Sequence, residues 1–202
     1  MSRAMGGDAP SLWLADRSEL VLTPGKAHRL YRLESGLVRL YTLDDAGLGV
    51  TLRFVKRGGV FGEEALTGRP RRYFAEAMAP SVIEVLDPAS MGDAELRALV
   101  TTLAAALDDV GMAMHRTATK QLAPRIAALI LELADSDLAT RDSDGLPVVR
   151  ITHHQIAMAA GSVRETATKA IGDLARLGAI YVGYRKVTVR DERLLREAAG
   201  DD

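Results

Sequence analysis

The chain has 202 residues, 48% of them hydrophobic and 26% charged, as is usual for a globular protein of one large or two small domains. The absence of cysteine excludes disulfides, cysteine-ligated iron–sulfur clusters and a cysteine nucleophile, and it is compatible with the cytoplasm. The net charge of −1 identifies no partner. No apolar run reaches the ~18 residues of a membrane helix, and the start MSRAMGGDAP lacks the apolar segment of a secretory signal. We therefore expect a cytoplasmic protein without a membrane segment.

A β-rich region is predicted from about Leu20 to Leu86. The stretch HRLYRLESGLVRLYTLDDAG alternates apolar and polar residues, breaks at Ser35-Gly36 and turns at Asp44 to Gly47. VTLRFV and SVIEVL are two further strands, closed by KRGG and by Asp87-Pro88. Short strands at this spacing, with turn residues between them, predict a barrel or roll.

A long helix is predicted from about Ala94 to Leu122. Its apolar residues recur with spacings of 4, 3, 4, 3, 4 and 3, which is a heptad seam, and so narrow a stripe needs a partner, either the roll or a second copy of the helix. Pro124 then marks the first turn of another apolar helix, and the segment Ser136 to Pro147 is expected to be a polar loop. The seam residues are Leu96, Val100, Leu103, Leu107, Val110, Met114 and Thr117.

The last third of the chain is predicted to begin with a β-branched strand at Val148 and two short helices. Thr152 is a good N-cap for the helix HHQIAMAA, and Gly161, which readily takes the left-handed conformation, ends that helix. Ser162 is expected to cap the next helix, with Glu165 three residues later completing a capping box.

Two helices joined at a glycine, 152–160 and 163–177, form a helix-turn-helix. The first two turns of the second helix carry Arg164, Glu165, Thr168 and Lys169 on one side, and the start of a recognition helix is the part that reaches base edges in the major groove. Arg can hold guanine, Glu can accept from cytosine, and Lys can reach guanine or phosphate. The alternative is that these residues are only a capping carboxylate and solvated charges. The expected buried face is Ala160, Ala167, Ala170, Ile171 and Leu174.

After this helix, the strands AIYV and VTVR joined at Gly183–Lys186 predict a two-stranded wing, and DERLLREAAGDD predicts a terminal helix with a frayed acidic end. Between Arg150 and Arg190 there are seven basic and two acidic residues, so this window has a charge of +5 in a nearly neutral chain. Such a field is typical of a phosphate-binding surface, although a solvated helix face would have the same composition.

These motifs resemble the cyclic-AMP receptor protein / fumarate-nitrate regulator (CRP/FNR) family. THHQIAMAAGSVRETATKAIGDLARLGAI is similar to its DNA-binding signature, whose Gly-x-x-Arg-Glu-Thr core stands at Gly161 and at 164–166. YRLESGLVRLYTLDDAGLGVTLRFVKRGGVFGEEAL resembles its β-roll, including the Gly62-Glu63 pair. The resemblance runs from about Leu20 to Arg190, and it is strongest to stress and stationary-phase activators of the Deinococcus–Thermus group.

The resemblance implies roles for particular residues. The family residues that match Arg164, Glu165 and Lys169 contact bases, and half-sites resemble TGTGA. The best-known member has Arg where Lys169 stands here; because Lys is a point donor rather than a planar fork, that position should discriminate less sharply. Most members activate by touching RNA polymerase through the region that matches 136–147, which could equally be an inert connection.

A cyclic-nucleotide site is only partly preserved in the roll. The family cassette has Gly-Glu and, about ten residues later, Arg followed by a hydroxyl that together hold the phosphate. Here Gly62 and Glu63 are present and Arg71 or Arg72 could supply the guanidinium, but Tyr73 and Phe74 follow instead of Ser or Thr. Val110 and Gly111 match the Thr-Ser pair that touches adenine. We therefore expect no cofactor, with cyclic AMP kept as the alternative ligand, and a structural role for Gly62 and Glu63.

Other chemistry is poorly represented. A metal-dependent roll enzyme needs clustered His and Glu, but His28 is the only histidine in the β-rich region, and no nucleophile–base set or phosphate-binding Gly loop is present. His115 is expected on a helix surface, with haem ligation as the alternative, and His153, just after the N-cap, is expected to touch a phosphate.

We therefore predict an α+β protein: an N-terminal β-roll of the cyclic-nucleotide-binding type (double-stranded β-helix, 1–93), a long dimerisation helix (94–122) and a C-terminal winged helix-turn-helix (123–202). The expected function is a homodimeric transcription regulator, not an enzyme, which binds palindromic double-stranded DNA and RNA polymerase and activates stress-response genes. The alternative is a ligand-gated sensor or roll-type protein whose winged domain is an interaction module. The expected DNA-binding residues are Arg164, Glu165, Thr168, Lys169, Thr152, His153, Ser162, Thr166, Arg185 and Lys186.

Overall fold

The structure, a computed structural model, describes residues 12–45, 47 and 49–200. The start of the chain, on which the expectation about a secretory signal rests, and the last two residues of the acidic end lie outside this range. The described residues form two compact units, one from 12–42 and 53–109 and the other from 43–52 and 110–200.

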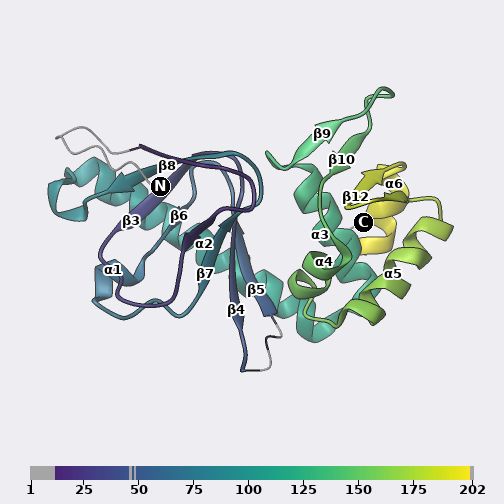
Figure 1. Ribbon diagram of the computed structural model, residues 1–202, viewed down its shortest axis with the longest axis horizontal. Coiled ribbons are helices and arrows are strands. Elements are labelled where there is room, and N and C mark those ends of the chain that lie inside the picture. Colours follow the sequence, from purple (N-terminus) through teal and green to yellow (C-terminus); the bar gives the residue numbers. More distant parts are fainter. Residues whose placement is uncertain (1–11, 46, 48, 201–202) are drawn as a thin grey trace. The chain divides into compact units, whose positions relative to one another are not determined.

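The predicted roll consists of two four-stranded sheets, with strand orders β1-β8-β3-β6 and β2-β7-β4-β5 (Figure 1). Leu33, Phe61 and Ile83 from the first sheet and Leu40 and Ala75 from the second are buried in one core cluster. Burial of each large side chain contributes about 1.5–3 kcal/mol, so this core holds the roll together. The strands are β1 Leu12–Ala15, β2 Leu20–Leu22, β3 Leu30–Ser35, β4 Val38–Leu43, β5 Gly49–Val55, β6 Val60–Phe61, β7 Phe74–Ala77 and β8 Ser81–Leu86, with the short helices α1 Glu64–Thr67 and η1 Pro88–Ser90.

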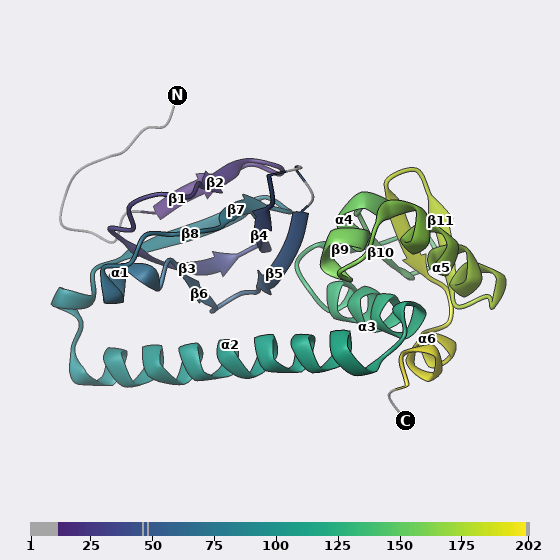
Figure 2. The same ribbon diagram turned by 90° about the horizontal axis from the view of Figure 1, so that it is seen from below.

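Helix α2 (Asp93–Thr119) is the long helix predicted from the heptad seam, and its part in the first unit runs along the strands of the roll in Figure 2. It ends three residues earlier than expected, before α3 (Leu122–Ala134), whose first turn contains Pro124. The seam residues do not all face the roll. Leu103 packs against the core cluster that contains Leu30 of the roll, as does Leu99, which lies outside the predicted seam, whereas Leu107 is 73% exposed.

The second unit contains α3 and a four-stranded sheet of order β11-β12-β10-β9. The expected loop between Ser136 and Pro147 was wrong in part, because β9 pairs antiparallel with β10 to form a hairpin (Figure 1). The strand residues Ala-Thr-Arg have no apolar alternation, since backbone pairing rather than burial defines this edge strand. The remaining elements are β9 Ala139–Arg141, β10 Pro147–Val149, α4 His153–Ala159, α5 Arg164–Arg176, β11 Ile180–Gly183, β12 Lys186–Val189 and α6 Glu192–Ala199.

The predicted fold class is confirmed: a roll, a long helix, and a helix-turn-helix followed by a β11–β12 wing. Every residue of the expected helix-turn-helix core is buried, and α5 packs on α3, α4 and β11. No described helix has the length and apolarity needed to cross a membrane.

Candidate nucleic-acid interface

Helix α4 begins at the cap that the sequence predicted. The Thr152 hydroxyl accepts the Gln155 backbone N–H at 3.2 Å, and the Gln155 side chain accepts the Thr152 backbone N–H at 3.0 Å. Two otherwise unpaired backbone donors are satisfied by this capping box, which fixes the start of the helix. Because its hydroxyl serves the cap, Thr152 has a structural role in addition to any contact with DNA.

The turn between α4 and α5 depends on Gly161, which has a φ of +60°, as expected for a glycine that ends a helix. The predicted capping box at Ser162 and Glu165 was wrong. Val163 is the N-cap of α5, with no side-chain cap, and the Ser162 hydroxyl lies 3.5 Å from the Val163 carbonyl. The helix begins one residue later than the pattern suggested, which moves Ser162 out of capping position. Glu165 is therefore not the capping carboxylate that the alternative interpretation made it.

Helix α5 presents a charged outer side. Arg164, Glu165 and Lys169 are exposed, and their side chains form no hydrogen bond or ion pair with the part of the chain that the structure describes. A cation at a helix N-terminus faces the positive end of the helix dipole, so Arg164 opposes helix stability by a few tenths of a kcal/mol to ~1 kcal/mol. An arginine at this position is therefore explained better by binding to a phosphate or a base outside the chain than by a contribution to folding.

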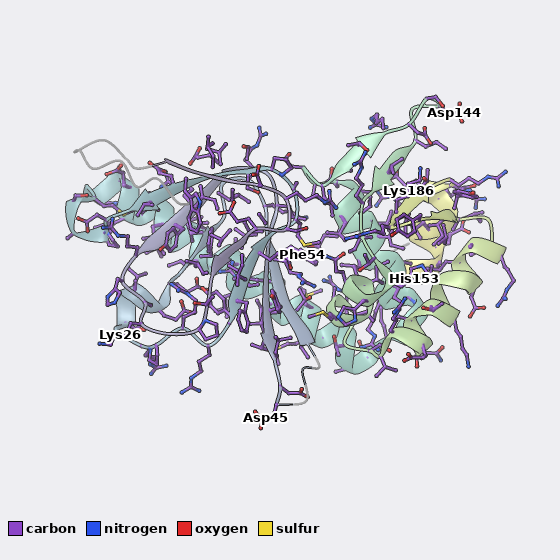
Figure 3. The ribbon with its side chains drawn as sticks, in the orientation of Figure 1. Lys26, Asp45, Phe54, Asp144, His153 and Lys186 are labelled. Carbon is purple, nitrogen blue, oxygen red and sulfur yellow. The ribbon has the colours of Figure 1, made fainter. Side chains whose placement is uncertain are left out.

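His153, labelled in Figure 3, connects α4 to this outer side of α5. Its Nδ1 lies 3.2 Å from the Thr168 Oγ1, and that hydroxyl donates to the Arg164 carbonyl at 2.8 Å. Burial of the ring and, secondly, the charge of Arg164 lower the pKa of His153 below its ordinary value. His153, Arg164 and Thr168 therefore form one cluster. No sequence pattern indicated this cluster, because 15 residues separate His153 from Thr168.

The wing carries the other predicted basic residues. Gly183 pairs with Lys186 at the end of the β11–β12 hairpin, and Tyr184 at the tip is 89% exposed. Arg185 has a φ of +54°, a conformation that costs a non-glycine residue about 1 kcal/mol or more. Arg185 and Lys186 are both exposed, and Lys186 is labelled in Figure 3.

Within the roll, Gly62 is required by the backbone. It has a φ of +85°, and a Cβ there would lie 2.7 Å from the Arg29 carbonyl oxygen. Its N–H donates at 2.9 Å to the hydroxyl of Tyr73, a buried residue, and that hydroxyl donates to Glu64 at 3.1 Å. Burial, assisted by the charges of Glu63 and Glu64, raises the pKa of Tyr73, so the hydroxyl stays a donor.

The remaining cassette residues are also engaged inside the chain. Glu63 is paired with Arg53 at 2.9 Å, a partner that the sequence did not indicate. Arg71 is 6% exposed, donates to the Thr23 carbonyl at 3.4 Å and lies over the Tyr73 ring, whereas Arg72 is exposed. Glu63 Oε2 and Arg71 Nε have no hydrogen bond within the described residues. The cassette does not fit a cyclic nucleotide well, because the Tyr73 hydroxyl already accepts the Gly62 N–H, and Tyr73 and Phe74 stand in the sequence where the family cassette has Ser or Thr.

The structure joins His153 of α4 to Thr168 of α5, while Arg185 and Lys186 lie next to each other on the β11–β12 wing of the same unit. Helix-turn-helix, wing and basic side chains together define a winged-helix DNA-binding protein. The described residues contain no cluster of three or more acidic, His or Cys side chains suited to a metal.

Comparison with known proteins agrees with this class. Residues 124–198 match the Crp-like helix-turn-helix domain, and residues 15–94 match the cyclic nucleotide-binding domain. The transcriptional regulator SdrP of Thermus thermophilus is 44% identical over 87% of this chain and 86% of its own length, and LdrP from the same species is 40% identical over 92% and 95%. The crystal structure of a CRP/FNR-family regulator from Thermus thermophilus has a TM-score of 0.88 at 41% identity, covering 94% of this chain and 98% of that one.

The chain therefore belongs to the CRP/FNR family. It is a DNA-binding transcriptional regulator and not an enzyme.

Proposed function

We propose that this regulator binds, as a homodimer, a palindromic operator with TGTGA-like half-sites, and that α5 reads each half-site. The observation that supports this most directly is at the start of α5, where the side chains of Arg164, Glu165 and Lys169 have no hydrogen-bond or ion-pair partner among the described residues. These residue types have base-edge partners in the major groove, and they stand where a recognition helix makes its base contacts. The wing residues Arg185 and Lys186 would hold the neighbouring phosphates.

The exposed face of α2 supports the homodimer. Val100, Leu107 and Met114 are 65%, 73% and 69% exposed and recur every seven residues, so they form an apolar stripe along the helix. A second copy of α2 would bury this stripe, and two-fold pairing would place two recognition helices about one DNA turn apart. We propose the domain limits expected from the sequence: roll 1–93, dimerisation helix 94–122 and winged helix-turn-helix 123–202.

We further propose activation of stress-response genes through contact with RNA polymerase. The β9–β10 hairpin offers the surface for that contact: its turn residues 142–145 are exposed, and Asp144 lies at its tip (Figure 3). The proposal of stress genes rests on the family resemblance and not on the hairpin.

Control by a cyclic nucleotide is not part of this proposal. Tyr73 already satisfies Gly62, and Val110 and Gly111 supply no side-chain hydrogen bond to an adenine. A ligand shifts an equilibrium only by its differential affinity for two states, and few contacts are left to generate one. The unpaired atoms of Arg71 and Glu63 are the observation that favours the ligand-gated alternative.

Fluorescence anisotropy with a duplex that carries two inverted TGTGA half-sites tests the proposal. The protein should prefer this duplex to one of shuffled sequence, and its affinity should fall steeply with salt as phosphate contacts release counterions. A protein-interaction module would bind neither duplex, and equal affinity for both would remove the claim of sequence reading.

A further inference from the structure

The hydrogen bonds of His153 determine where its neutral ring carries a proton. The Thr168 hydroxyl has one hydrogen, and it is donated to the Arg164 carbonyl at 2.8 Å. The hydroxyl oxygen can then only accept from His153 Nδ1, 3.2 Å away, so the neutral ring holds its proton on Nδ1. In that tautomer Nε2 carries a lone pair and no hydrogen, and it makes no hydrogen bond to the described residues.

A lone pair at Nε2 repels a phosphate oxygen, which is itself an acceptor. The ring gains a donor at Nε2 only when it takes up a second proton, and it then also carries a positive charge. We propose that His153 binds a DNA phosphate only as an imidazolium, so that each protomer takes up one proton when it binds its operator. The inference rests on the proposed function, because it needs DNA along the outer side of α5.

The surroundings of His153 keep the free ring neutral. Helices α5 and α3 pack against α4. Helix α5 places Arg164 near the ring, and no charged group of α3 contributes to the lowered pKa of His153. Burial and the Arg164 charge lower the pKa of His153, and the adjacent His154 on the same helix is exposed. A DNA phosphate would act in the opposite direction and raise the pKa in the complex. DNA affinity should therefore increase as pH falls through the bound-state pKa, and level off below the free-state pKa.

The test is the anisotropy titration with the inverted TGTGA duplex at constant ionic strength, from pH 8.5 to pH 6. Wild-type protein should gain about tenfold in affinity for each unit between the free and bound pKa of His153, per protomer. His153→Gln should lose this pH-dependent gain. The matched control His154→Gln, which removes the neighbouring imidazole, should keep it.

Two further results separate the possible failures. Thr168→Val removes the hydroxyl that fixes the tautomer, so the neutral ring can carry its proton on Nε2 and the pH-dependent gain should shrink. A His153→Gln protein with the wild-type pH dependence overturns the inference, and so does a Thr168→Val protein with the full gain. Absence of binding by wild-type protein at every pH would instead contradict the proposed function.

Discussion

Arg164 stands at the first position of a helix, where its charge opposes the helix dipole and finds no partner in the described chain. Arg164→Ala should therefore leave folding intact and cost roughly 1–3 kcal/mol of binding at the operator, mostly at one base position, because a guanidinium can make a bidentate contact with guanine. Binding to single-base operator variants measures this. Uniform weakening on every duplex would assign Arg164 to the backbone instead.

Arg185 provides the contrasting residue. Arg185→Ala on the wing should weaken binding to all sequences about equally and reduce the salt slope by about one, as expected for a lost phosphate contact. Titrations at several salt concentrations, with operator and shuffled duplexes, measure both effects. A loss confined to the operator would make the wing a reader of bases.

Tyr73 supports the roll through its hydroxyl. Tyr73→Phe leaves the Gly62 N–H buried without an acceptor and should destabilise the protein by about 1–3 kcal/mol in urea unfolding. Tyr184→Phe is the control, because that hydroxyl is at an 89% exposed position and its loss should be nearly neutral. Equal stability of both variants would mean that water replaces the hydroxyl, and the cassette would then be open to a ligand.

At the scale of elements, α2 has two apolar faces. The face with Leu99 and Leu103 packs against the roll, so the exposed face with Val100 and Leu107 is the one available to a second copy. Val100→Glu with Leu107→Glu should yield monomers, because two charges would be buried in the paired stripe. Ala105→Glu is the control, since it is exposed and lies two residues from Leu107, on the far side of the helix. Sedimentation velocity distinguishes the two. An unchanged dimer in the double variant would place the interface elsewhere.

The elements that the sequence predicted well have a periodic or capping signal. Alternation defined the roll, the seven-residue repeat defined α2, and Thr152 with Gly161 defined α4. Strand β9 has no such signal, because a short polar edge strand is defined by its neighbour. The start of α5 was misplaced because Ser162 satisfies the composition of a cap without its geometry.

Contacts between distant residues were the part of the site that sequence could not supply. Arg53 with Glu63, Tyr73 with Gly62, and His153 with Thr168 each join residues 10 to 15 positions apart through the fold. The outer residues of α5 were predictable, because helical periodicity alone separates its buried face from its charged one.

For the whole molecule, we predict that the protein binds its operator without an added effector, because Gly62 and Glu63 of the cassette are already paired inside the roll. Saturating cyclic AMP should leave the affinity for the operator within a factor of two or so, well below the tenfold that ~1.4 kcal/mol of coupling would give. A tenfold increase, or a nucleotide that copurifies in the roll, would restore the ligand-gated alternative.

The central claim is that a dimer reads a palindrome through two copies of α5, and selection of bound duplexes from a random-sequence pool tests it most directly. The enriched sequences should contain two inverted TGTGA-like half-sites with centres about 10 bp apart, and the Arg164→Ala protein should lose preference at one position in each. No enrichment, or a single asymmetric site unaffected by Arg164→Ala, would contradict it.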